Sequence, residues 1–560
     1  MKKYLIFAAS ALALASCSSD DFLGENPGTA QNATTAINFG GEAGKITRGI
    51  STSNEGTTQK MLAGQFKVYG VKITNGTISH NVFPDYYVWD VADKNTTSNT
   101  NGWEYVGEDG ASNLGTGQIT LDKDQTIKYW DYSATEYRFV AGSPISAFTF
   151  YVPSDGTTKN IESATITGLG GHIVANTTET ANTFNPVYVA EPKVVAKADY
   201  KNTVQFNFVR QQSMVRVGFY ETIPGYSITD IKFYKADGTA PAGNNIILYS
   251  SENDYFVGGT NVSGTVTYDW TTAKPSYTFA YTDNTNLKKS KNWYAGKLTT
   301  LPTTSLPTTS SESNVALLYG TDKDMSATTG YFTVLPTQVT TASPILIKCD
   351  YELTSDDGSG ETIKVTGATA AIPAAFSKWE ANTRYTYLFK ISDNTNGTTG
   401  DPSNTDDPAG LFPITFDAVV KEVEQGTTTT VATPSITTYQ EGSVTDKGIE
   451  YKKGKEIKVT VTNANGDVQT LTSGGSTVGS VAVYKFTDAI TEAEIQVKGI
   501  TGATAVTDTT IDSNVLKFTP DTEGYYAIRY LTQAAEGTKP AAYTYKVVHV
   551  KAATTGTGGH

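Results

Sequence analysis

Short runs in which apolar and polar residues alternate recur along the chain, and they constrain its fold more than any other feature. Val204–Phe208, Tyr385–Ile391 and Ile457–Val461 are three of them. A period of two places every second side chain on one face of a strand. The apolar residues are mainly Val, Ile, Tyr and Phe, with 33 tyrosines, and 51 glycines mark the loops between runs. β-branched and aromatic residues favour strands, so the sequence predicts an all-β chain of tandem β-sandwich domains.

The length of 560 residues predicts three or four domains at roughly 150 residues each. We place an N-terminal sandwich at 49–200, a second at 201–430 and a third at 431–560. Val204–Phe208 and Val215–Phe219 are expected to form a pair of adjacent core strands. The polar segment 392–409 resembles a linker when taken alone, but the alternation that resumes at Ile414 favours a long loop inside the second sandwich.

The first residues have the layout of a secretory signal. Lys2 and Lys3 precede an apolar run that ends at Leu14, too short for a membrane-spanning helix of about 20 residues. Residues 14–17, Leu-Ala-Ser-Cys, resemble a bacterial lipobox, which implies removal of a signal peptide, 1–16, and lipidation of Cys17. The alternative is a plain signal peptide with an incidental cysteine. Residues 17–48 are expected to be a flexible tether or propeptide, with one short strand-like stretch at Ala36–Phe39.

The residues that usually carry catalysis or metal binding are sparse. The four histidines form no HxH or HExxH motif, and no GxSxG or phosphate-binding loop is present. We therefore expect no catalytic residues, no metal and no cofactor, although loop carboxylates could bind calcium and a hydrolase could use two distant carboxylates. The net charge of -13 without a basic cluster argues against a nucleic-acid partner. Cys349, the second of two cysteines, is expected to be a small buried apolar residue.

Aromatic residues gather in the first predicted domain. Trp89, Trp103 and Tyr105 could form a platform on which a sugar stacks, because aromatic faces are flat and apolar with a polar edge. The alternative is that they fill a core or hold long loops in place, and we favour that alternative.

The third predicted domain contains a recognisable corner. Residues Leu516–Ile528 run from one strand through a turn with Asp521 and Gly524 into another strand that starts with two tyrosines. This resembles the E-to-F corner of immunoglobulin-like sandwiches, in which a tyrosine hydroxyl bonds back to the corner backbone.

Taken together, four features resemble the fimbrillin family of Bacteroidetes, the lipoprotein-derived subunits of type V pili. They are the lipobox at Cys17, the arginine segment Ile46–Gly49, the alternating runs of 204–219, and Trp379 followed by the strands at 385–391 and 414–416. The resemblance covers about 49–430. It departs from the family where Glu380–Asn382 follow Trp379 without the family's glycine, where Val423 stands in place of a tryptophan, and in the added third domain.

The resemblance implies two fimbrillin-like sandwiches followed by one immunoglobulin-like sandwich, in an outer-membrane lipoprotein that carries palmitate on Cys17. It also implies proteolytic processing between Arg48 and Gly49, and assembly with other pilus subunits through donated β-strands. The implied function is a fimbrial subunit or adhesin, at the tip or as an accessory subunit, that meets a surface glycan or protein receptor. The alternative is a surface glycan-binding lipoprotein, which would stay uncut and monomeric.

Overall fold

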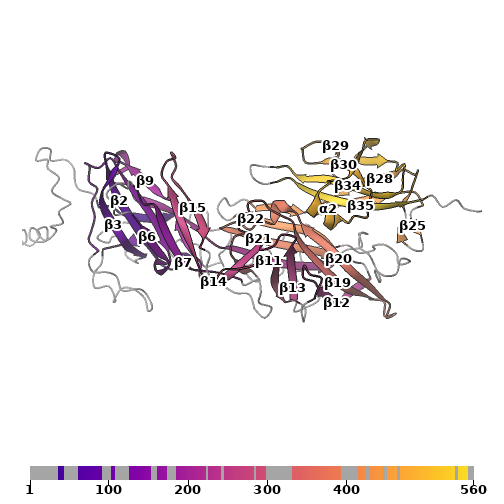
Figure 1. The fold of residues 1–560 in the computed structure, drawn as a ribbon, viewed down its shortest axis with the longest axis horizontal. Helices are drawn as coiled ribbons and strands as arrows, with labels where there is room; N and C mark the ends of the chain where they lie inside the picture. Colours follow the sequence, from indigo (N-terminus) through magenta and orange to yellow (C-terminus); the bar gives the residue numbers. More distant parts are fainter. Residues whose placement is uncertain are drawn as a thin grey trace, which may run out of the picture.

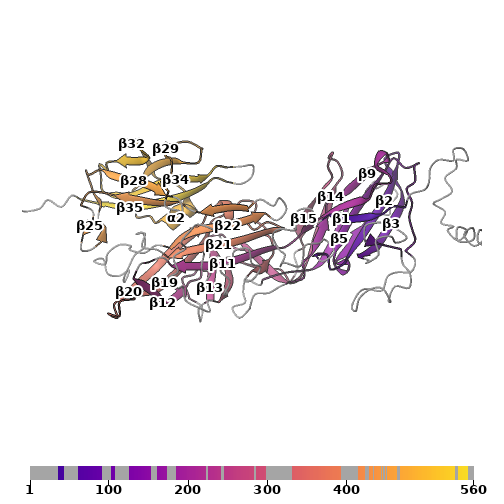
Figure 2. The ribbon, with the colours of Figure 1, turned by 180° about the vertical axis from the view of Figure 1, so that it is seen from behind.

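The computed structural model is built almost entirely of strands (Figure 1). Strands lie in three bodies: the one with the indigo strands is at one end of the molecule, and the yellow one lies beside the orange one, as Figure 2 shows from behind. The model describes residues 36–42, 61–90, 103–106, 125–152, 160–172, 184–221, 223, 225–240, 245–282, 285–297, 331–391, 414–422, 428–432, 434–442, 444–445, 448–449, 451–462, 467–535 and 540–552.

The first sandwich pairs an eight-stranded sheet with a five-stranded one. In order, the larger sheet contains β1 (Phe39–Glu42), β10 (Val204–Arg210), β8 (Tyr188–Ala190), β5 (Glu136–Ser143), β2 (Gln65–Thr74), β3 (Thr77–Asp90) and β4 (Trp103–Glu104), with β9 (Lys193–Ala196) also on β5. The smaller sheet contains β15 (Ser276–Tyr281), β14 (Phe256–Asp269), β7 (Ser163–Gly171) and β6 (Phe148–Tyr151), with β16 (Lys288–Ser290) on β14. The short helices η4 (Ile145–Ala147) and η5 (Lys197–Asp199) join neighbouring strands.

Both faces of the larger sheet are packed. One face meets the smaller sheet across a core that includes Val71 and Val189. The other face curls around an aromatic core that includes Phe66 and Phe206, and this curl brings β4 close to β1. Along β5, Phe139 and Ala141 face the aromatic core and Val140 faces the other core, as period-two patterning requires.

The second sandwich has two five-stranded sheets. One contains β18 (Phe332–Val334), β11 (Ser213–Glu221), β21 (Thr383–Ile391), β22 (Ile414–Glu422) and β23 (Thr428–Ala432). The other contains β12 (Tyr226–Phe233), β19 (Ile345–Ser355), β13 (Asn245–Ser250) and β17 (Asn292–Lys297), with β20 (Thr362–Ile372) on β19 and η7 (Ala374–Phe376) after it. Because β21 and β22 are adjacent, residues 392–409 connect two strands of one sheet, as predicted.

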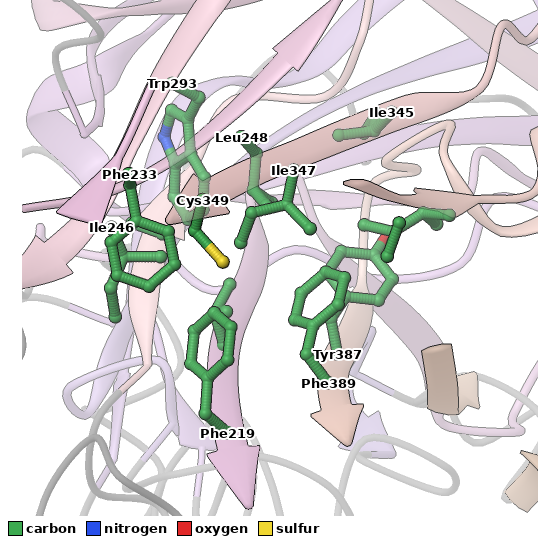
Figure 3. Close-up of a cluster of buried hydrophobic side chains, with 14 of the residues drawn as sticks. Phe219, Phe233, Ile246, Leu248, Trp293, Ile345, Ile347, Cys349, Tyr387 and Phe389 are labelled. Atoms are coloured by element: carbon green, nitrogen blue, oxygen red, sulfur yellow. The ribbon is translucent and has the colours of Figure 1, made fainter. Parts of the chain in front are cut away.

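Cys349 lies in the core of this sandwich. Its sulfur points into the middle of a cluster that includes Phe219, Leu248 and Phe389 (Figure 3). The thiol is fully buried and its pKa is raised by burial, with the Asp350 charge adding to the effect. The prediction of a small buried apolar residue is confirmed.

The third sandwich follows β23 in the chain. One sheet contains β24 (Ser435–Tyr439), β28 (Ile457–Thr462), β33 (Val515–Phe518) and β32 (Thr509–Asp512). The other contains β27 (Tyr451–Lys452), β35 (Ala542–Lys551), β34 (Gly524–Gln533), β30 (Ser480–Phe486) and β29 (Thr472–Ser473), with β31 (Thr504–Val506) on β30. A small hairpin, β25 (Val444–Thr445) and β26 (Gly448–Ile449), and a helix, α2 (Glu492–Lys498), complete it.

The predicted corner is present in the third sandwich. The Tyr526 hydroxyl donates a hydrogen bond to the Thr522 carbonyl at 2.9 Å, across the turn between β33 and β34. Helix α2 starts with a capping box, in which Thr491 and Glu494 satisfy each other's backbone amides. Both interactions join groups that are only three or four residues apart in sequence, and each stabilises a turn or a helix end.

The chain does not leave the first sandwich at residue 200, as the sequence suggested. β10 lies in the larger sheet of the first sandwich, β11 lies in the second sandwich, and the two do not pair with each other. The expectation of adjacent strands was wrong because Gln211 and Gln212 continue the chain forward and provide no reversing turn. The chain then returns with β14, which pairs with β7, and with β15, which pairs with β14, and together they complete the smaller sheet.

The crossing between these two sandwiches is therefore short and polar. Gln212 accepts a hydrogen bond from the Val187 amide and donates one to the Asn185 carbonyl, both at 3.0 Å. Gln211 donates to the Tyr277 hydroxyl at 3.0 Å. Both glutamines are buried. These bonds hold the crossing to the first sandwich, and the Gln212 carbonyl accepts a bond from the Asn382 amide of the second sandwich at 3.1 Å.

Candidate functional site

Three of the sequence-predicted site residues lie outside the part of the chain that the structure describes. These are the lipidation residue Cys17 and the processing pair Arg48 and Gly49. Their assigned roles stay predictions.

The three aromatic platform residues do not form an exposed surface. Trp89 is 8% exposed, Trp103 2% and Tyr105 0%, and all three belong to the aromatic core of the first sandwich. Trp103 packs edge-on against Phe66, with ring centroids 5.0 Å apart. They fill a core, which corrects the platform hypothesis and matches the alternative favoured above. The sequence could not separate the two because a strand-bound aromatic looks the same in either role.

The most distinctive feature of this core is the N-terminal segment 36–42, which ends six residues before Arg48. Most of the 17–48 stretch was expected to be a flexible tether, yet this part of it belongs to the first sandwich. Ala36 bridges Tyr129, and the Ile37 amide donates to the Lys128 carbonyl at 2.8 Å. The segment then crosses to β10, where β1 runs parallel from Phe39, opposite Val204.

Two apolar side chains anchor the segment. Ile37 and Phe39 are both 0% exposed. Phe39 stands among four rings, with centroid separations of 5.0 Å to Phe83, 5.6 Å to Tyr105, 5.8 Å to Phe139 and 5.8 Å to Phe206. Phe83 belongs to β3, Phe139 to β5 and Phe206 to β10, and Tyr105 directly follows β4. Phe39 therefore joins the two ends of the curled sheet. Offset and edge-on ring pairs contribute stability beyond the area they bury.

The Tyr105 hydroxyl also contacts this segment. It donates to the Ile37 carbonyl at 2.8 Å and accepts from the Lys128 amide at 3.1 Å. Burial raises the pKa of this phenol well above its ordinary value, so it stays protonated and able to donate. On the other side of the segment, the Val204 amide donates to the Asn38 carbonyl at 2.9 Å. The backbone of residues 37–39 is thus bonded on both flanks.

This arrangement is a strand seated in a groove. The floor is aromatic, one wall is the edge of β10, and the other wall is the Lys128–Tyr129 backbone with Tyr105. If the segment left, the groove would lose two buried apolar side chains, and β10 would present unpaired backbone groups at its edge. Such an edge is a template for another strand.

The described residues hold no group of His, Cys, Asp and Glu side chains arranged to bind a metal ion. Among the same residues, no helix is long and apolar enough to cross a membrane.

A signal for the groove was present in the sequence. Ala36–Phe39 was the strand-like stretch noted within 17–48, and the structure confirms that it joins a sheet. Its partner could not be predicted, because β10 lies about 165 residues further along and the pairing is parallel, without a hairpin turn to announce it.

Comparisons with known proteins give the following findings. No protein-family model and no curated protein matches the chain. A solved fimbrial protein from Bacteroides vulgatus is 14% identical, covers 70% of this chain and 100% of its own, and has a TM-score of 0.34. A candidate cell adhesion protein from Parabacteroides distasonis is 10% identical, with coverages of 69% and 96% and a TM-score of 0.30.

A third solved structure, a candidate polysaccharide-binding protein from Bacteroides thetaiotaomicron, is 11% identical, with coverages of 66% and 90% and a TM-score of 0.21. At identities and scores of this size, the likenesses assign no function to this chain.

Proposed function

We propose that this protein is a cell-surface fimbrial subunit or adhesin that is exported as a lipoprotein through Cys17 and assembled by strand addition after cleavage between Arg48 and Gly49. One observation carries the proposal. The segment 36–42 precedes Arg48 in the chain and yet occupies a groove in the first sandwich. A cut at Arg48 would separate the strand from the sandwich that it completes.

Cleavage changes the thermodynamics of this strand. Before the cut, the covalent link keeps the segment at a high effective concentration beside its groove. After the cut, it is a separate peptide held by the anchors Ile37 and Phe39 and a few backbone hydrogen bonds. Burying one large apolar side chain contributes about 1.5–3 kcal/mol, so two anchors give a weak complex that dilution dissociates. The groove is then free for another strand.

The incoming strand belongs to the next subunit in this proposal. It would need apolar side chains two residues apart, to replace Ile37 and Phe39, and a backbone parallel to β10. The main-chain bonds provide affinity and the ring-lined pocket around Phe39 provides register, because a shift by one residue would turn both anchors away from the core.

The third sandwich follows directly after β23, the edge strand of the second. A body at this end of the chain would interrupt a uniform stalk, which favours a tip or accessory position. The receptor in that case is a surface glycan or protein.

Arg48→Ala tests the proposal. We expect the variant to be exported and lipidated, to keep residues 17–48 at its N-terminus and to form no high-mass, detergent-resistant polymers. Lys45→Ala is the matched control, since it removes a basic residue three positions away and should be cut and assembled normally. N-terminal sequencing of surface-shed protein and gel analysis without boiling provide the two measurements.

Identical N-termini in the wild type and in Arg48→Ala, with polymers from neither, would sink the proposal. That result would favour the alternative of a monomeric glycan-binding lipoprotein, which needs a binding surface other than Trp89, Trp103 and Tyr105 because these are buried. A subunit that keeps its lipid and anchors the pilus is distinguished by polymers that contain the uncut chain.

A further inference from the structure

The outer face of the larger sheet in the third sandwich carries aromatic rings around one arginine. Side chains of β34 alternate between the two faces of this sheet. Ile528 and Tyr530 point into the core of the sandwich, so Arg529 points to the outer face. Tyr484 of β30 and Tyr543 of β35 stand opposite residues two positions away from Arg529, and they therefore share its face.

Arg529 contacts both of these rings. Its guanidinium carbon is 4.8 Å from the ring centroid of Tyr484 and 4.6 Å from that of Tyr543. All three side chains are half-buried in the complete chain. Contact with the aromatic rings stabilises the cation and orients its planar group. The ring faces supply no oxygen to accept from the N–H groups of the guanidinium, which carries five of them.

The Arg529 guanidinium has no carboxylate partner in the part of the chain that the structure describes. None of the ion pairs found there includes it. Arg138 in the first sandwich provides a comparison. Its guanidinium lies over the Trp270 ring at 5.5 Å, and its Nε donates to the Glu136 carboxylate at 2.6 Å. Both arginines have aromatic support, but the charge of Arg138 is neutralised within the chain, whereas Arg529 can accept an anion from outside.

Neighbouring groups add a wall and a further polar atom to the cluster. Helix α2 packs on the same face, and Nε2 of Gln496 donates to the Tyr543 carbonyl at 2.7 Å. Tyr545 stands directly opposite Arg529. Burial raises the pKa of the Tyr545 phenol to about 12, although the Arg529 charge opposes this shift. The Tyr545 hydroxyl therefore stays protonated at neutral pH and can donate a hydrogen bond.

The cluster lies beside the joint between the second and third sandwiches. Ala542, the residue before Tyr543, belongs to the core cluster of the second sandwich. Figure 1 shows the yellow body beside the orange one. Ligand sites occur preferentially at such interfaces between domains, where aromatic side chains surround a few polar groups.

The chemistry of the cluster favours a sugar that carries a carboxylate. A tyrosine ring offers a flat apolar face, against which the C–H face of a sugar packs, and a hydroxyl at its edge. The guanidinium fork matches the two oxygens of a carboxylate. Acidic peptides also carry carboxylates, but β34 is paired with a strand on each side and has no free edge for a peptide backbone.

We propose that Tyr484, Arg529 and Tyr543 form a binding site for an acidic glycan, in which sugar rings carry carboxylate groups. The site rests on the proposed function, in which an adhesin meets a surface receptor, and it gives the chemical class of that receptor. The carboxylate pairs with the Arg529 guanidinium, and the sugar ring packs against the exposed part of a tyrosine ring.

Two probes carry the carboxylate on different sugars, a trimer of galacturonic acid and a sialylated trisaccharide. The uncut full chain is titrated with each probe by calorimetry. The salt concentration is about 0.15 M, because the net charge of -13 repels anions at low ionic strength. We expect saturable binding of at least one probe, and the affinity should fall at least tenfold when the carboxylates of that probe are methyl-esterified.

The variants test the role of the arginine. Arg529→Met should lower the affinity at least tenfold, and Arg529→Lys should lower it less, because it keeps the charge and loses the planar fork. Arg138→Met is the matched control, since it removes an arginine that also lies over an aromatic ring, and it should bind like the wild type. If Arg529→Met does not fold, as circular dichroism would show, Arg529→Lys provides the comparison.

Four results would overturn the proposal. They are no saturable binding of either probe, equal affinity for the esterified probe, equal affinity in the variants of Arg529, and tighter binding of a tetraglutamate peptide than of either sugar. The last result would make an acidic peptide the partner. The measurement uses the uncut chain in solution and needs no polymer, so a negative result here leaves strand exchange after Arg48 standing. Failure of the Arg48→Ala test would likewise leave the measured glycan affinities unchanged.

Discussion

In the first and third sandwiches, one sheet edge is closed by a short parallel strand, but this strand comes from a different place in the chain in each sandwich. In the first, β1 runs parallel to β10, and in the third, β27 runs parallel to β35. β1 lies ahead of Arg48, at the end of the chain that a single cut can release. β27 lies between β24 and β28 in sequence, inside the third sandwich. A single cut on either side of β27 leaves it covalently attached to another strand of that sandwich. Under the proposed strand exchange, the position of the edge strand in the chain would decide which sandwich becomes an acceptor, because the two edge strands pair in a similar way.

The side chains of the two edge strands differ as well. Phe39 is enclosed by four rings and contributes to the centre of a core. Tyr451 in β27 is 7% exposed and shares a hydrogen bond with the Thr438 hydroxyl at 2.6 Å. The edge strand of the first sandwich fills a pocket with the Phe39 side chain. The edge strand of the third sandwich is held by a hydrogen bond to a residue nearby in sequence.

The largest expected effect comes from shortening the Phe39 side chain of β1. Phe39→Ala should destabilise the first sandwich of the uncut chain by about 3–5 kcal/mol, the usual cost of emptying a buried phenylalanine site. Hydrogen exchange at β10 should accelerate, because the Val204 amide bonds to Asn38. After processing at Arg48 and release of the strand, the variant and the wild type are the same chain and should exchange alike.

Tyr451→Ala is the counterpart in the third sandwich and should accelerate exchange at β35 both before and after processing. Tyr151→Ala changes an aromatic residue of β6 that is 57% exposed and lies outside the groove, and it should have little effect on either sandwich. Equal exchange at β10 in Phe39→Ala and the wild type before processing would show that β1 does not support the first sandwich.

The closing strand of the third sandwich carries a second difference, the buried cation Lys546. Burial lowers the pKa of Lys546 to about 8, partly opposed by Glu492. Between pH 8 and 10.5 the unfolded state binds this proton and the folded state does not, so its contribution to stability rises with pH. The full shift corresponds to on the order of 3 kcal/mol.

We therefore expect the stability difference between wild type and Lys546→Met to move in favour of the wild type from pH 8 to 9.5. Urea unfolding of the third sandwich, monitored by hydrogen exchange at β34, measures this stability difference at each pH. A difference that does not change with pH would contradict the shifted pKa. The first sandwich should show no such response to this substitution.

The smallest expected effects come from two hydroxyl groups in matched roles. Tyr105→Phe removes the bond to the Ile37 carbonyl, and Tyr526→Phe removes the bond to the Thr522 carbonyl. Each should cost about 1 kcal/mol. The effect of Tyr526→Phe should persist after processing at Arg48, whereas that of Tyr105→Phe should fall, because one of its partners leaves with the strand. Thermal unfolding of uncut and processed chains gives four values to compare.

Local patterns in the sequence predicted individual strands well, because alternation reports which face of a strand is buried. Tyr385–Ile391 and the run from Ile414 were predicted as closing strands, and they pair as β21 and β22. The corner at Tyr526 was also predicted, since its groups lie within five residues.

Sequence patterns failed where the partner was distant. The run at 204–208 fits equally well beside Val215–Phe219 or beside β1, and alternation cannot choose between them. The same holds for β14 and β15, whose return to the first sandwich depends on pairing with β7, about 90 residues earlier. The burial of Arg210, Arg216 and Arg384 was missed for the same reason, because they come from three strands that only the fold brings together.

The crossing at Gln211 and Gln212 would have a mechanical consequence in the proposed surface fibre. The chain passes from β10 to β11 through two residues, returns through β14 and leaves again towards β17, so several covalent segments span the joint. A pull on the two ends would load these segments in parallel and would have to shear strands at the heart of both sheets before the joint could lengthen. The pair of sandwiches should therefore respond to tension as one stiff rod, without a hinge to absorb the load.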